Sequence, residues 1–94
     1  MTNITFIFLA TLFYISEPAN KENLYSWQIT FDSYQRCEQF FDGYGDKLLT
    51  GVVDHGTKKF GEPVGVEYLS CAMVEVSPSL TQPRVIGQKV MYQQ

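Results

Sequence analysis

The feature that most constrains this chain is a change in hydrophobic period at Asp32-Ser33. Just before it, large apolar residues alternate with polar ones, the pattern of a strand that covers one face. The alternating apolar residues are Tyr25, Trp27, Ile29 and Phe31. Because the apolar face of such a strand normally packs against the protein interior, we expect all four in the core.

Just after this point the apolar residues are spaced by three and four, which predicts one face of an amphipathic helix. Aspartate and serine often begin helices, because their side-chain oxygens accept hydrogen bonds from free backbone N–H groups. The apolar face consists of Tyr34, Cys37, Phe41, Tyr44, Leu48 and Val52. We expect Phe41 and Leu48 to pack in the core with the strand.

Glycines complicate the extent of this helix. Each glycine inside a helix costs about 1 kcal/mol relative to alanine, but the apolar spacing continues through all three that occur here. We expect one helix over residues 33–54, kinked near residues 43–45, and a pair of shorter helices is the alternative. Gly56 is the expected C-cap, and a loop follows it up to Pro63.

The N-terminal residues 4–15 are almost wholly apolar and leave three interpretations open. The β-branched and aromatic content favours a buried strand. A secretory signal would carry basic residues in front, and a membrane-spanning helix needs about 17–25 apolar residues, so a signal or anchor fits less well. The third interpretation is a segment that inserts into a partner or a membrane. The residues available for such contact are Phe6, Phe8, Leu9, Leu12 and Phe13.

The rest of the chain adds a polar linker and two strands. Residues 16–23 are polar and contain a proline, and strands are expected over residues 64–76 and 84–92. Apolar residues lie on both faces of the first of these strands, which indicates a central strand or one that bends midway. One face would hold Val64, Val66, Tyr68, Ala72, Val74 and Val76, and the other Leu69, Cys71 and Met73.

These elements predict an α+β fold of two layers. One long helix packs on a three- or four-stranded, mainly antiparallel sheet in the order β-α-β-β, the fourth strand being the N-terminal segment. With 94 residues and 45% hydrophobic content, we expect a single domain over residues 1–94. Residues 1–20 would form the apolar segment with its linker, and residues 24–92 the α+β core.

Cys37 on the helix and Cys71 on a strand can both face the shared interior. A disulfide would close a loop of about 34 residues and contribute about 3.5–4 kcal/mol through the lost entropy of the unfolded chain. The alternative is two reduced cysteines that pack as small hydrophobic residues, which a cytosolic location would favour.

The residues that carry chemistry are sparse. Two cysteines and one histidine cannot complete an ordinary four-ligand zinc site. His55 lies at the expected end of the helix, where a capping or exposed role is more common than catalysis. The net charge is −3 and Lys58-Lys59 is the sole basic cluster, which does not fit a nucleic-acid-binding surface. We therefore expect no catalytic residue, metal, cofactor or nucleic acid.

The spacing Trp27-x-x-x-Phe31-x-Ser33-x-x-x-Cys37-Glu38-x-Phe40, followed by Cys71 in a valine-rich strand, resembles small two-cysteine proteins of unknown function from bacteria and marine cyanophages. The resemblance covers residues 24–76. It implies a short phage-encoded or exported domain with a helix-to-strand disulfide, and it implies no enzymatic activity.

The sequence thus predicts a small, phage-encoded, non-enzymatic accessory protein that binds a protein partner through exposed strand edges. One alternative is a structural or homo-oligomeric virion-type protein that uses residues 4–15. Another is a secreted or membrane-anchored domain. The location would be the host cytoplasm or the virion for a phage protein, and extracytoplasmic if Cys37 and Cys71 are bonded.

Overall fold

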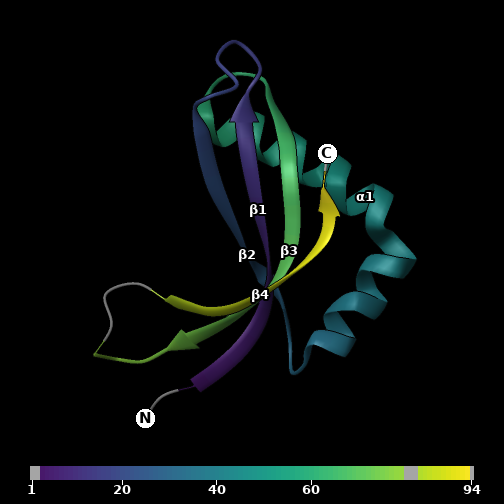
Figure 1. The fold of residues 1–94 in the computed structure, drawn as a ribbon, viewed down its shortest axis with the longest axis vertical. Coiled ribbons are helices and arrows are strands. Elements are labelled where there is room, and N and C mark those ends of the chain that lie inside the picture. Colours follow the sequence, from purple (N-terminus) through teal and green to yellow (C-terminus); the bar gives the residue numbers. More distant parts are fainter. Residues whose placement is uncertain (1–2, 80–82, 94) are drawn as a thin grey trace.

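The computed structural model describes residues 3–79 and 83–93. One helix lies behind a curved sheet of four strands, and it follows the second strand along the chain (Figure 1). The elements in chain order are β1 (Asn3–Tyr14), β2 (Lys21–Phe31), α1 (Tyr34–Phe60), β3 (Val64–Val76) and β4 (Arg84–Gln93).

The sheet has the strand order β2-β1-β3-β4, and all neighbouring strands are antiparallel. The expected α+β arrangement of a helix on an antiparallel sheet is therefore confirmed, with the N-terminal segment as its fourth strand. The order leaves β2 and β4 as the two edges. Within the described residues, no helix combines the length and apolar character that crossing a membrane requires.

The N-terminal apolar segment forms β1, which pairs along its length with β2 on one side and β3 on the other. Phe8, Leu9 and Leu12 are each no more than 3% exposed, and Phe6 and Phe13 are half-buried. The interpretation of this segment as a signal, an anchor or a partner-inserting arm is therefore corrected. An interior strand has neighbours on both sides and both faces, which explains why nearly every residue in it is apolar.

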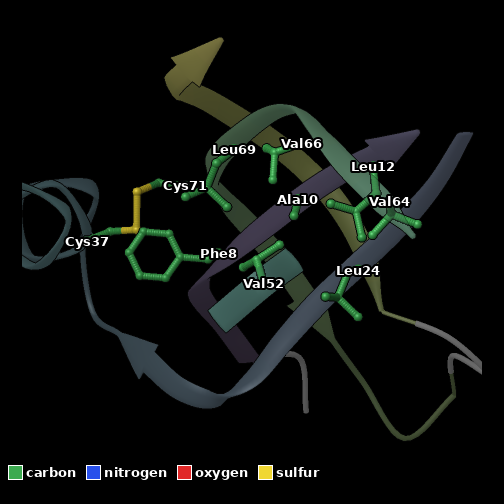
Figure 2. Packing of buried hydrophobic residues seen from close by; sticks show 10 residues of the cluster. All are labelled: Phe8, Ala10, Leu12, Leu24, Cys37, Val52, Val64, Val66, Leu69 and Cys71. Carbon is green, nitrogen blue, oxygen red and sulfur yellow. A yellow bond between two sulfur atoms is a disulfide. The ribbon is translucent and has the colours of Figure 1, made fainter. Parts of the chain in front are cut away.

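The main hydrophobic core lies between α1 and the sheet (Figure 2). Alternate residues of β1 point into it, namely Phe8, Ala10 and Leu12, and Leu24 of β2 joins them. Ile7 and Leu9 point to the opposite side, where they form a smaller cluster. The other members of that cluster are Ala72, Val74 and Val85.

An irregularity in β3 changes which of its residues face the helix. Thr11 pairs with Tyr68, but the next residue, Leu12, pairs with Val66, so that Glu67 is an extra residue in the ladder. This bulge brings Val64 and Val66 to the same side as Leu69 and Cys71, and all four belong to the main core. The predicted grouping of Val64 and Val66 with Ala72 and Val74 is wrong for this reason.

Helix α1 begins with a serine cap and ends later than expected. The Ser33 side chain accepts a hydrogen bond from the backbone N–H of Arg36 at 3.2 Å. Non-helical backbone angles at Tyr44 confirm the kink near the glycines. The helix continues to Phe60, and Gly61 is its C-cap with φ of 78°, a left-handed conformation that glycine adopts easily. Gly56, the predicted cap, is instead buried within the helix.

Cys37 and Cys71 join the first part of α1 to β3. Their sulfurs lie 2.08 Å apart, within a disulfide, and both residues are 0% exposed (Figure 2). The ring of Phe8 lies beside the sulfurs in the same view. The bond therefore ties the helix to an interior strand of the sheet inside the main core.

Candidate groove between the edge strand and the helix

The edge strand β2 presents three large apolar side chains at the surface. Tyr25 is 39% exposed, Trp27 is 43% and Ile29 is 37%, whereas Leu24 is only 6%. The prediction that Tyr25, Trp27 and Ile29 are core residues is therefore wrong. Leu24 provides the inward contact from this strand, and the Tyr25 and Trp27 rings stack on each other with centroids 6.3 Å apart.

Tyr25 is exposed because it pairs with Leu9, whose side chain points away from the helix. Trp27 and Ile29 fall instead within a wide irregularity of the strand. Ser26 pairs with Phe8 and Phe31 pairs with Phe6, so that residues 27–30 all lie opposite Ile7 alone. A bulge of this kind bends the strand and breaks the alternation of its side chains. Phe31 returns to the core edge, where its ring packs against Phe8 with centroids 5.5 Å apart.

A groove with a volume of about 500 Å³ runs between this part of β2 and α1. Its floor comes from core side chains of three strands, and its rim comes from the exposed β2 residues. The apolar residues that line it are Phe8, Ala10, Leu24, Tyr25, Trp27, Ile29, Leu48, Val52 and Leu69. Leu48 thus lies both against the main core and along the groove, while Phe41 packs on the core outside it.

The helix wall of the groove carries Lys47, Gly51 and His55, spaced four residues apart and therefore on one helix face. A Cβ added at Gly51 would meet no atom within 4 Å, so the wall is open between the two basic side chains. The acidic residues that directly precede them in sequence, Asp46 and Asp54, border other hollows of the surface. Lys47 borders the hollow of Asp46 as well as the groove, whereas His55 lines the groove and neither of these hollows.

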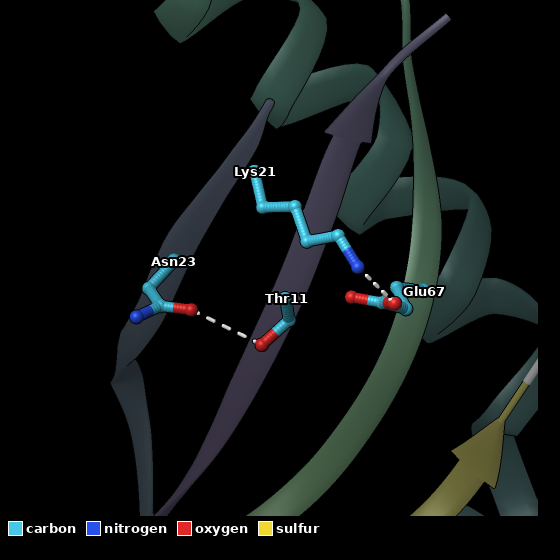
Figure 3. A network of polar contacts seen from close by, with 4 residues as sticks. All are labelled: Thr11, Lys21, Asn23 and Glu67. Atoms are coloured by element: carbon cyan, nitrogen blue, oxygen red, sulfur yellow. Dashed lines mark hydrogen bonds and ion pairs between the residues drawn. The ribbon is translucent and has the colours of Figure 1, made fainter. Parts of the chain in front are cut away.

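The opposite face of the sheet is polar at the level of Thr11 and Asn23 (Figure 3). The Thr11 hydroxyl donates a hydrogen bond to the Asn23 side-chain oxygen at 3.1 Å. Lys21 of β2 reaches past β1 to form an ion pair with Glu67, the bulge residue of β3. On this same face the next pair of residues is Leu9 and Tyr25, so the polar patch ends beside the exposed Tyr25 ring.

The sequence-predicted residues divide between core and groove. Cys37 and Cys71 come together as a bonded pair, and the β1 residues serve as core. Lys47 and Gly51 were not singled out from the sequence, although their spacing with His55 is visible there. Within residues 3–79 and 83–93, no three His, Cys, Asp or Glu side chains are grouped closely enough to hold a metal ion.

Comparisons with protein-family models, with curated proteins and with solved structures found no match for this chain.

Proposed function

We propose that this protein is a small, non-enzymatic interaction module that binds an extended segment of a protein partner along β2. The observation that carries the proposal is the groove rim, where three large apolar residues of an edge strand are exposed side by side. An extended peptide that pairs with a sheet edge gains main-chain hydrogen bonds, and its alternate side chains can fill an adjoining groove.

The two edges of the sheet differ in a way that supports β2 as the binding edge. Exposed edges are usually protected from unwanted pairing by charged residues. In β4, Arg84 pairs with Glu75 at 3.3 Å, and Lys89 forms an ion pair with Glu38 of the helix. In β2, residues 23–31 contain no charged side chain. Strand addition is expected along residues 23–26, where β2 keeps its register with β1.

The compartment and origin form part of the same proposal. Disulfides persist in oxidising compartments and are rare in the cytosol. The Cys37–Cys71 bond therefore favours a role outside the cytoplasm. The resemblance to cyanophage proteins adds a phage origin, and an exported phage protein is consistent with both.

The test is a selection of peptides from a displayed library of random twelve-residue sequences, with the disulfide-bonded protein as bait. Selected peptides are then titrated, and binding is followed by their fluorescence polarisation. We expect Trp27→Ser to weaken binding at least about tenfold, as for a tryptophan at the centre of an interface. Gln28→Lys, which places a charge on the edge, is expected to weaken it as well.

The matched control is Tyr92→Ser, which removes an exposed aromatic residue from the opposite edge strand. This variant should bind the selected peptides as the parent protein does. The proposal is wrong if no peptide is selected, or if peptides bind the Trp27 and Tyr92 variants equally well.

A further inference from the structure

We infer that the partner segment is acidic: an extended, apolar-rich peptide with a carboxylate that lies between Lys47 and His55. This inference rests on the proposed function and specifies the chemistry of the partner at the same groove. It follows from the charge distribution around the groove and from the open position between the two basic residues.

The charges that line the groove are of one kind. Lys47 and His55 are its only ionisable side chains apart from the Tyr25 phenol, and no carboxylate lines it. Within the described part of the chain, neither of the two forms an ion pair. A lysine at the edge of an apolar groove favours a ligand that supplies the opposite charge.

The position of Gly51 makes the two basic residues accessible from one point. It lies one helical turn from each of them, is exposed, and leaves the space above its backbone open. A carboxylate above Gly51 could accept hydrogen bonds from the Lys47 ammonium group and from an imidazole N–H of His55. Its own chain would continue along the uncharged edge of β2.

The same arrangement disfavours a second copy of this chain as the occupant. Pairing of two β2 edges would bring the uncharged residues 23–31 of one copy against Lys47 and His55 of the other. The basic residues would then be partly desolvated without an opposite charge, which is unfavourable. An acidic peptide supplies the charge that a second β2 strand lacks.

The experiment uses the same displayed library and compares acidic content before and after selection. We expect enrichment of Asp or Glu at one position of the selected peptides. Replacing that residue by its amide should weaken binding about two- to fivefold, the range for one exposed ion pair. Lys47→Gln should lower the affinity for the acidic peptide by a similar factor, and it should leave the affinity for the amide form of that peptide unchanged. Raising the salt concentration should reduce the difference between the two peptides.

The matched control is Lys58→Gln, which removes an exposed lysine of the same helix outside the groove. It should leave both affinities unchanged. If selected peptides depend on Trp27 but show neither acidic enrichment nor sensitivity to Lys47, the inference fails while the proposed function stands. If no peptide depends on Trp27, both fail.

Two other occupants would also overturn the inference. Sedimentation that shows a dimer in the parent protein and a monomer in Trp27→Ser would assign the groove to a second copy. Oleate at micromolar concentration that shifts Trp27 emission and displaces every selected peptide, whether acidic or neutral, would assign it to an amphiphile.

Discussion

The backbone of Gly56 in α1 lies directly against the Leu12 side chain of β1. A Cβ atom at position 56 would stand 2.6 Å from Leu12 Cδ1 and 3.0 Å from a methyl group of Val64. The absence of a side chain therefore allows the second part of the helix to approach the two interior strands closely.

This contact predicts that Gly56→Ala destabilises the protein, although alanine is the better helix former. The gain in helix propensity is about 1 kcal/mol, whereas overpacking at an interior site costs about 1–3 kcal/mol. We expect a net loss of up to about 2 kcal/mol in the free energy of unfolding, measured by urea denaturation. Gly51→Ala is the control and should stabilise by about 0.5–1 kcal/mol, since nothing lies within 4 Å of the added atom. Equal effects at both positions would contradict the close contact.

Leu24 is buried and Trp27 is exposed, although the sequence pattern predicted Trp27 in the core. Substitutions at these two positions of β2 should therefore differ in their effect on stability. Leu24→Ala removes a buried side chain of the main core and should cost about 2–4 kcal/mol. Trp27→Ser should cost no more than about 1 kcal/mol, because much of the ring is already in water. Thermal unfolding followed by circular dichroism measures both. A larger loss for the Trp27 variant would place that ring in the core.

The disulfide predicts a strong dependence of stability on oxidation state. Replacing both Cys37 and Cys71 by alanine should lower the free energy of unfolding by about 3–4 kcal/mol, because the unfolded chain loses its cross-link. Reduction of the parent protein should lower the urea midpoint in the same direction. A midpoint that does not change with dithiothreitol, together with two free thiols by mass spectrometry, would show that the cysteines are not bonded.

The raised pKa of Tyr14 predicts that the protein loses stability at alkaline pH. Desolvation raises the pKa of its phenol above the usual 10.0, and the negative charge of Glu22, hydrogen bonding to it and the charge of Glu62 raise it further. Because the folded-state pKa lies above the unfolded-state value, the stabilising contribution is complete below about pH 10. It is lost as the pH rises through the folded pKa. Glu22→Gln should move the pKa back toward 10, which ¹³C NMR of labelled tyrosine can measure. An unchanged Tyr14 titration in that variant would contradict this account.

The local sequence pattern was sufficient to locate β2 and the start of α1. Alternation identified β2, and the serine cap and the three-and-four spacing identified the start of α1, because these signals depend on residues adjacent in sequence. The later end of the helix was not visible. From the sequence alone Gly56 resembles a helix C-cap. Only its close approach to Leu12 shows that it allows the helix to pack against the sheet.

The residues of the groove could not be derived in the same way. The period of β2 marks Trp27 as apolar, but an apolar residue faces the interior only if something covers it. The sequence by itself determined the α+β composition, the apolar character of the N-terminal segment and the cysteine pair that could meet, and it left open whether that segment is a strand. The tertiary structure alone decided that β1 takes the interior position and β2 an edge, since strand order depends on pairing between distant segments. That order, the pairing of Tyr25 with Leu9 and the bulge opposite Ile7 together leave Tyr25, Trp27 and Ile29 at the surface of an edge strand.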